Sequence, residues 1–335
     1  MAAPIQSIAV YGAGSWGTAL ALQLARNGLN VLLWDFNPAH VATLQRERCN
    51  THYLPGIAFP ESLQCSADLA ALAAFADHHL LVVPSHGFRA LLQQLAPLLQ
   101  AKDAVCWATK GLELNTGKLL HEVLQETLPQ CAMYGVVSGP TFAAEVASGL
   151  PTAMTVAAST PALAQAIATA FQANNYRVYL SNDVIGVELG GAVKNVLAIA
   201  AGISDGLGFG ANARVALITR GLAEMMRLSS KLGAQPETLM GLAGMGDLVL
   251  TCTDNQSRNR RLGLALGQGK DRDAAIAEIG QAVEGAKSAL AIGKLAASAG
   301  VEMPICEQVY RILYEQLPPR LAVQELLARD IKAEF

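Results

Sequence analysis

Residues 7–22, SIAVYGAGSWGTALAL, decide the fold. They run from an apolar strand through a turn with three glycines into the start of a helix, the context in which a G-x-G-x-x-G motif is specific. Gly12 permits the tight turn, Gly14 lets the backbone approach a pyrophosphate, and Gly17 lets the helix pack closely on the strand. Unpaired N–H groups at the helix start then face the phosphates. A plain strand–helix turn and a methyltransferase loop are the alternatives, and the stretch favours a dinucleotide site.

Short apolar runs alternate with helical segments through the first half of the chain. Such alternation predicts a mostly parallel sheet with crossover helices, whose strands are apolar throughout because both faces are covered. The expected strands are Ser7–Tyr11, Asn30–Trp34, Leu80–Val83, Ala104–Thr109, Tyr134–Ser138, Ala153–Ala157 and Tyr176–Leu180, with helices over Trp16–Asn27 and Pro161–Ala173. The first half is therefore predicted to be a Rossmann-type α/β domain.

The pattern changes after about residue 183. Val184–Gly202 and Asn212–Lys231 are long helical segments rich in alanine, leucine and glycine, and no convincing strand follows residue 181. The polar residues 181–183 are suited to cap the next helix. We predict a dinucleotide-binding domain over residues 1–183 and an all-helical substrate domain over residues 184–335.

Composition excludes several classes of protein. Of 335 residues, 52% are hydrophobic and only 15% charged, which excludes a disordered chain. The apolar runs stop after about eight residues or are broken by charges, short of the roughly 18–20 residues that a membrane span needs. The net charge of −3 and the pI near 6.1 argue against binding to nucleic acid or anionic lipid.

Neither the cysteines nor the histidines suggest a metal or disulfide framework. The six cysteines are scattered without a C-x-x-C pair, and no ligand spacing joins His78, His79 and His86. The first seven residues contain no basic region and no cleavage-site pattern. We expect a cytoplasmic protein without a metal.

Asp35 ends the second predicted strand, 23 residues after Gly12. A carboxylate at this place hydrogen-bonds the ribose hydroxyls of adenosine and repels a 2′-phosphate, which favours NADH over NADPH. The alternative is a solvated turn residue ahead of Asn37 and Pro38.

Other candidate residues follow strand ends or stand in unusual surroundings. Lys110 follows a strand and can hold a substrate oxygen, whereas Ser138–Thr141 can present hydroxyl and N–H groups. Lys194 lies among small and apolar residues, so its charge must reach solvent or meet a partner, and a buried lysine suits proton transfer. Ser257 and Arg258 begin a helix after a polar stretch, an arrangement that suits phosphate or a solvated basic turn.

Several blocks resemble the NAD(P)-dependent sn-glycerol-3-phosphate dehydrogenases of the bacterial biosynthetic type over essentially the whole chain. The blocks are residues 12–20 (GAGSWGTAL), 107–113 (WATKGLE), 138–143 (SGPTFA), 189–196 (LGGAVKNV), 206–221, 246–253 (GDLVLTCT), 257–261 (SRNRR) and 283–285 (VEG). Their number and order make the resemblance far more specific than any single motif.

The resemblance implies roles for individual residues. Lys194 is implied as the catalytic proton donor and acceptor, with Lys110 and Asp247 orienting the substrate oxygens. The implied substrate-binding residues are Lys110, Gly139, Thr141, Lys194, Asn195, Asp247, Ser257, Arg258 and Asn259. The implied cofactor-binding residues are Gly12, Gly14, Ser15, Trp16, Gly17, Asp35, Phe36, Lys110, Ala143, Arg258, Val283 and Glu284.

The reaction so implied is the reversible reduction of dihydroxyacetone phosphate to sn-glycerol 3-phosphate, the backbone of glycerophospholipids, with NAD or NADP as cofactor. A related two-domain reductase of a carboxylate substrate, of the β-hydroxyacid or ketopantoate type, is the alternative enzyme. A module that senses NAD without catalysis is the alternative from another class. The apolar helical half is compatible with a homodimer.

Overall fold

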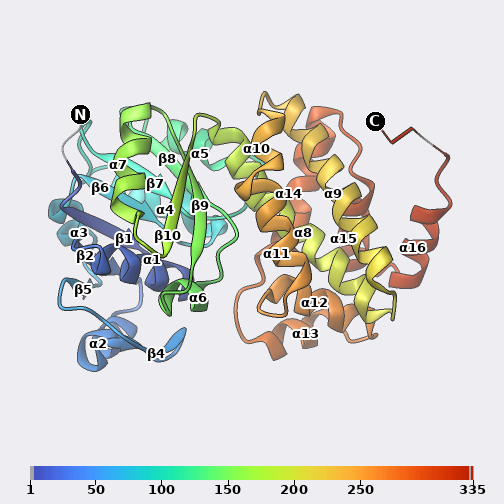
Figure 1. The fold of residues 1–335 in the computed structure, drawn as a ribbon, viewed down its shortest axis with the longest axis horizontal. Helices are drawn as coiled ribbons and strands as arrows, with labels where there is room; N and C mark the ends of the chain where they lie inside the picture. The colour runs from blue at the N-terminus through green and yellow to red at the C-terminus, as the bar shows by residue number, and fades with distance from the viewer. Residues whose placement is uncertain (1–3, 332, 335) are drawn as a thin grey trace.

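The chain folds into a sheet-containing half and a helical half that lie side by side (Figure 1). The computed structural model describes residues 4–331, 333 and 334. Eight strands form one sheet in the order β10-β9-β8-β7-β6-β1-β2-β5. Only the β8–β9 pair is antiparallel among these strands, so the predicted mostly parallel sheet is confirmed.

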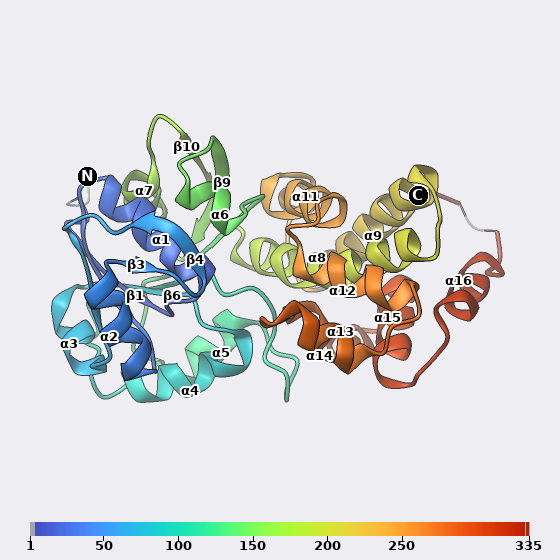
Figure 2. The same cartoon turned by 90° about the horizontal axis from the view of Figure 1, so that it is seen from below.

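Helices cover both faces of this sheet, α1 and α7 on one side and α3, α4 and α5 on the other (Figure 2). The strands are β1 (Ser7–Tyr11), β2 (Asn30–Trp34), β5 (Leu63–Ser66), β6 (His78–Leu81), β7 (Ala104–Trp107), β8 (Tyr134–Ser138), β9 (Thr152–Ala158) and β10 (Tyr176–Ser181), with a separate hairpin of β3 (Cys49–Asn50) and β4 (Leu54–Ala58). The helices are α1 (Ser15–Arg26), α2 (Pro38–Glu47), α3 (Leu69–Phe75), α4 (Ser85–Leu95), α5 (Leu120–Thr127), α6 (Ala143–Ala147) and α7 (Pro161–Phe171).

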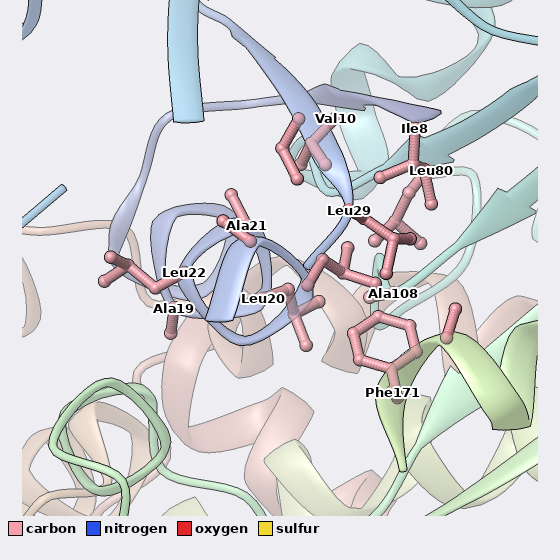
Figure 3. Packing of buried hydrophobic residues seen from close by; sticks show 14 of the residues in the cluster. Ile8, Val10, Ala19, Leu20, Ala21, Leu22, Leu29, Leu80, Ala108 and Phe171 are labelled. Atoms are coloured by element: carbon pink, nitrogen blue, oxygen red, sulfur yellow. The ribbon is translucent and has the colours of Figure 1, made fainter. Parts of the chain in front are cut away.

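Helix α1 is buried on all sides, since Gly17 to Ala25 are buried without a gap. Leu20 and Leu22 are fully buried in one hydrophobic cluster with Val10 of β1 and Phe171 at the end of α7 (Figure 3). Burying a leucine side chain stabilises the fold by about 1.5–3 kcal/mol. The packing therefore holds the helix start at the carboxyl end of β1.

Two sequence predictions for this half need correction. The strand expected at Leu80–Val83 runs instead over His78–Leu81, because the fully buried His79 is accommodated by a 2.9 Å hydrogen bond between its Nδ1 and the Tyr11 hydroxyl. The edge strand β5 and the β3–β4 hairpin were not predicted. Strands β3 and β5 are short and carry polar residues, and β4 is interrupted by Pro55 and Gly56, so none of them has the continuous apolar run that marked the other strands.

The second half consists of helices after Ser181 in the described part of the chain. They are α8 (Val184–Gly206), α9 (Ala211–Lys231), α10 (Pro236–Met240), the π-helical turn η1 (Leu242–Gly246), α11 (Asp247–Thr253), α12 (Arg258–Gly267), α13 (Arg272–Ile279), α14 (Glu284–Ala299), α15 (Pro304–Tyr314) and α16 (Pro319–Leu327). Asp183 caps α8 by accepting the N–H of Gly186 at 2.8 Å, as expected for this junction. The domain bounds at 183 and 184 stay a prediction.

Helix α8 is the centre of the helical half. It is long and apolar enough to cross a membrane by length and composition, but 89% of its apolar window is buried inside the protein, as in a core helix. Its burial places two of the charged residues it carries, Glu188 and Lys194, in the interior.

Helices α8 and α12 cross at backbone contact. A Cβ atom on Gly202 would lie 2.1 Å from the Arg260 carbonyl oxygen, and one on Gly263 would lie 2.0 Å from the Ile199 carbonyl oxygen. Glycine is required at both positions because any side chain would part the two helices. The crossing fixes Lys194 of α8 relative to the start of α12.

Candidate active site

The glycine loop between β1 and α1 has the form that a dinucleotide needs. Gly12 has φ +119°, and a Cβ atom there would lie 2.7 Å from the Val82 carbonyl oxygen; a Cβ atom on Gly17 would lie 1.8 Å from the Gly12 carbonyl oxygen. A Cβ atom on Gly14 would meet nothing within 4 Å, so the space beside it is open. Gly14 is also the N-cap of α1 and gives no side-chain cap, which leaves the first N–H groups of the helix for a ligand.

A second observation also fits a bound cofactor. The indole Nε1 of Trp16 is buried and has no hydrogen-bond partner among the described residues. Buried donors are ordinarily paired, so an unpaired one beside the open loop is suited to a ligand acceptor. The residues present therefore fit a dinucleotide with its pyrophosphate at the start of α1.

One cleft of about 910 Å³ brings most of the predicted residues together. It runs from the glycine loop to the start of α12. Its lining includes Gly12, Gly14, Ser15, Trp16, Gly17, Asp35, Phe36, Lys110, Thr141, Ala143, Lys194, Asn195, Asp247, Ser257, Arg258, Asn259 and Glu284. Of the predicted residues, Gly139 and Val283 lie outside this lining.

Those two residues nonetheless adjoin the cleft. The Gly139 carbonyl oxygen is 3.4 Å from Lys110 Nζ, and a Cβ atom on Gly139 would lie 2.8 Å from the Met154 Cα. Val283 is buried and is the N-cap of α14, directly before Glu284. Both residues therefore place neighbours that face the cleft.

Two lysines share one carboxylate at the centre of the cleft. Asp247, at the start of α11, accepts from Lys194 Nζ through Oδ1 at 2.5 Å and from Lys110 Nζ through Oδ2 at 2.6 Å. Lys194 and Asp247 are 6% and 1% exposed, so this contact is largely desolvated. Lys110 lies in the loop after β7 and Lys194 lies on α8, so Asp247 connects the two halves of the chain.

The surroundings of Lys194 change its acidity. Burial disfavours the charged ammonium and lowers the pKa of Lys194 to about 7. The negative charge of Asp247 opposes this lowering, and the positive charge of Lys110 adds to it. An amine with this pKa can both give and take a proton at neutral pH.

The end of the cleft at α12 carries an arginine and two amides. Ser257 caps the helix by accepting the N–H of Arg260 at 3.2 Å. Asn259 Nδ2 donates to Asn195 Oδ1 at 2.9 Å, while its Oδ1 accepts the Gly285 N–H at 2.9 Å. These bonds tie α8, α12 and α14 together around the cleft.

Arg258, the first residue of α12, faces an acidic partner. Burial lowers the pKa of Arg258, and the carboxylate of Glu284 opposes this; burial likewise raises the pKa of Glu284, which Arg258 partly offsets. Arg258 Nη1 donates to Gln281 Oε1 at 3.2 Å. A guanidinium with donors to spare at a helix start is suited to a phosphate.

Two contacts in the site were not predicted from the sequence. Thr251 Oγ1 accepts from Lys194 Nζ at 2.9 Å, and Gln281 holds Arg258. Thr251 stands four residues after Asp247 on α11 and therefore shares its face, a spacing that could have identified it. Gln281 lies in the turn before α14 and gave no signal.

Comparison with known proteins decides the family. The model described as NAD-dependent glycerol-3-phosphate dehydrogenase N-terminus matches residues 7–164, and the model of the C-terminus matches residues 183–324. The chain belongs to the NAD-dependent glycerol-3-phosphate dehydrogenase family. It is an NAD(P)-dependent oxidoreductase, as the sequence indicated.

Members of the family from bacteria match the chain from end to end. A glycerol-3-phosphate dehydrogenase (NAD(P)+) of Thioalkalivibrio sulfidiphilus is 59% identical over 328 residues, which is 98% of each chain. One from Vibrio campbellii is 56% identical over 98% of this chain and 95% of its own. The crystal structure of glycerol-3-phosphate dehydrogenase from Coxiella burnetii has 51% identity and a TM-score of 0.94, covering 97% of this chain and 99% of that one.

The fold extends to reductases of other substrates. A ketopantoate reductase from Ralstonia eutropha matches with a TM-score of 0.59 at 17% identity, covering 96% of this chain and 99% of its own. At such identity only the fold is shared. The carboxylate-substrate alternative is not favoured, because the bacterial relatives at 56% and 59% identity are named glycerol-3-phosphate dehydrogenases. Among the described residues, no group of three or more histidine, cysteine or acidic side chains is placed to hold a metal ion.

Proposed function

We propose that this protein interconverts dihydroxyacetone phosphate and sn-glycerol 3-phosphate with NADH or NADPH, and that Lys194 is its proton donor and acceptor. The observation that carries the proposal is the Lys194–Asp247–Lys110 contact in the middle of the cleft. It stands between a loop suited to a pyrophosphate and an arginine suited to a phosphate. A dinucleotide and a small phosphate ester can therefore meet at the lysines.

The chemistry follows from the charges that the reaction creates. The nicotinamide cofactor, when bound, supplies the hydride that adds to the carbonyl carbon. Negative charge then grows on the carbonyl oxygen, which the Lys194 ammonium stabilises and protonates, becoming a neutral amine. In the reverse direction the neutral amine accepts the hydroxyl proton. Asp247 holds both lysines in place, and Lys110 keeps a second positive charge beside the oxygen.

The phosphate supplies the binding energy that positions the carbonyl. Arg258 with Asn259 at the start of α12 is proposed to hold it, which uses contacts remote from the reacting carbon to orient that carbon. Gly12, Gly14 and the start of α1 are proposed to hold the cofactor pyrophosphate, and Asp35 its adenosine ribose. The 7% exposed Asp35 carboxylate favours NADH.

The test is the oxidation of NADH and NADPH by dihydroxyacetone phosphate, with unphosphorylated dihydroxyacetone as control. We expect rapid oxidation with the phosphorylated ketone only, and faster oxidation of NADH than of NADPH. Equal rates with both ketones would contradict the role of Arg258. No oxidation with either cofactor, despite cofactor binding, would overturn the dehydrogenase function.

The proposed partner beyond the substrate is a second copy of the chain. Support comes from an apolar groove of about 990 Å³ between α9, α15 and α16, next to which Leu327 is 81% and Val215 60% exposed. Its lining also carries Arg220, Lys231 and Glu334, charges of both signs that can pair with their copies. Light scattering should give a dimer mass for the wild type and a lower mass for Leu327→Glu. A monomeric wild type would exclude this partner.

The protein is further proposed to act in the cytoplasm and to supply the backbone of glycerophospholipids. Support comes from its six cysteines, which are all unpaired and five of them buried, as expected in a reducing compartment. Cell fractionation with an antibody to the chain checks the location. Radiolabelled glycerol phosphate recovered in lipid, and lost on deletion of the gene, checks the supply.

A further inference from the structure

Behind Asp35 lies a chain of polar side chains that the proposed catalysis does not use. The Asp35 Oδ2 is 3.4 Å from His40 Nδ1 on α2, and His40 Nε2 is 3.4 Å from the Oδ1 of Asn50 on β3. The His40 and Asp35 side chains are 13% and 9% exposed, and Asn50 is fully buried. Asp35 lines the cleft, whereas His40 does not.

The orientation of Asn50 is fixed by its other bonds. Its Nδ2 donates to the Ala13 carbonyl oxygen and to Thr18 Oγ1, both at 2.8 Å, so its Oδ1 is the atom that faces His40. The same Oδ1 accepts the Tyr53 N–H at 3.1 Å. Asn50 thus connects the glycine loop to the histidine behind Asp35.

His40 therefore has an oxygen acceptor at each ring nitrogen. A neutral imidazole donates from one nitrogen only, whereas the protonated ring donates from both and carries a positive charge. The other Asp35 oxygen, Oδ1, accepts the Asn37 N–H at 2.9 Å. The carboxylate is held in place on both sides, and the charge state of the ring decides how much negative potential it presents to the cleft.

We propose that His40 is a specificity-determining residue that acts through Asp35 on the 2′ position of the cofactor. With His40 protonated, the Asp35 charge is offset and a 2′-phosphate is tolerated. With His40 neutral, the uncompensated carboxylate selects the 2′-hydroxyl. Because imidazole changes charge between about pH 5 and 8, the preference for NADH over NADPH rises with pH. This inference rests on the proposed use of both cofactors.

In the described part of the chain, His40 is faced by groups from the end of β2 and from the β3–β4 hairpin. Asp35 lies at the end of β2, while His52 and Tyr53 of the hairpin have ring centroids 6.5 and 5.5 Å from the imidazole. His52 is an exposed histidine whose ring lies beside that of His40, so it is the matched control.

The test measures binding rather than turnover, by calorimetric titration of NADH and NADPH at pH 6 and pH 8 without substrate. For the wild type, the ratio of the NADPH to the NADH dissociation constant should rise about fivefold or more between the two pH values. His40→Gln should lose most of that rise, and His52→Gln should keep it. The part that persists in His40→Gln measures the titration of the 2′-phosphate itself.

Equal pH dependence in the wild type and in His40→Gln would overturn the proposal. Should His40→Gln not fold, Asp35→Asn carries the test. Its ratio of the NADPH to the NADH dissociation constant should lose most of the rise between pH 6 and pH 8, and a full wild-type rise there would be equally contradictory. Failure of the proposed function gives a different result: the binding ratios would be as expected here, but dihydroxyacetone phosphate would not oxidise NADH or NADPH.

Discussion

The two ends of the cleft bind their ligands by opposite means. The glycine-loop end offers backbone N–H groups and empty space, with Gly14 meeting nothing within 4 Å. The α11–α12 end offers charged side chains, with Lys194 only 6% and Asp247 only 1% exposed. The backbone site holds its ligand by its shape and by the dipole of the helix start. The side-chain site holds its ligand by charges, and the rest of the fold must offset the free energy of desolvating them.

The two ends of the cleft are therefore sensitive to different substitutions, one to those that add atoms and the other to those that remove them. At the backbone end, binding or stability is lost when atoms are added, because an added atom occupies the space of the ligand or separates a strand from a helix. At the side-chain end, activity or binding is lost when atoms are removed, because the removal of one charge leaves its partner unpaired. Four substitutions and one titration test this contrast.

Lys194→Ala has the largest expected effect. Removing the proton donor should lower kcat for ketone reduction by about 10²–10⁴-fold. The dissociation constant of NADH should change little, because the glycine loop remains. Steady-state kinetics and calorimetry measure the two quantities. Lys102→Ala, at an exposed lysine that contacts Asp77, is the control and should retain wild-type kcat; a comparable loss there would point to general destabilisation.

Arg258→Ala should act on the phosphate. Loss of charge-assisted hydrogen bonds worth about 1.5–3 kcal/mol corresponds to a fall in kcat/KM for dihydroxyacetone phosphate of roughly 10–150-fold. The residual rate with unphosphorylated dihydroxyacetone should not change. A matched loss with both ketones would mean that Arg258 serves the cofactor or the fold instead. Initial rates over a range of each ketone decide between these results.

Gly17→Ala and Gly14→Ala separate the two ways in which added atoms do harm. A methyl on Gly17 meets the Gly12 carbonyl oxygen, so unfolding free energy should fall by about 1–3 kcal/mol. A methyl on Gly14 meets no protein atom, so stability should hold while NADH binding weakens. Thermal denaturation with and without NADH measures both effects. A destabilised Gly14→Ala would contradict the open space inferred there.

The pH dependence should differ in sign between the two reaction directions. Burial places the pKa of Lys194 near 7 in the free enzyme, so above that pH the ammonium needed for reduction is lost and the amine needed for oxidation accumulates. kcat/KM for reduction should fall about tenfold per unit above pH 7, while that for oxidation should rise through pH 7 and level off. Parallel slopes in the two directions would assign the titration to another group.

The fold was predictable wherever the pattern was strong. The strand–glycine–helix start and the apolar strands gave the sheet, and its mostly parallel character was confirmed. The β3–β4 hairpin was not predictable, since β3 has only two residues and β4 is interrupted by Pro55 and Gly56. Its fully buried Asn50 is held by bonds to residues 13 and 18. Only the tertiary structure creates that environment.

The candidate site was predictable as a set of residue types more than as an arrangement. Lys194 among small neighbours indicated burial, which the structure confirms, but the sharing of Asp247 with Lys110 joins residues 137 apart in the chain. Asp35 lines the cleft and accepts the Asn37 N–H as a turn residue does, but with 7% exposure it is not the solvated residue of the alternative interpretation. The functional roles of these residues stay predictions.

The glycine-to-backbone crossing of α8 and α12 has a consequence for substrate length. Lys194 lies on one helix and Arg258 starts the other, and the contacts at Gly202 and Gly263 leave the helices no room to approach further. Separating them would expose buried backbone rather than rearrange flexible side chains. The distance between Lys194, proposed to protonate the oxygen, and Arg258, proposed to bind the phosphate, is thus fixed by the fold. A ketose phosphate one carbon longer should therefore be rejected because of its length rather than its charge.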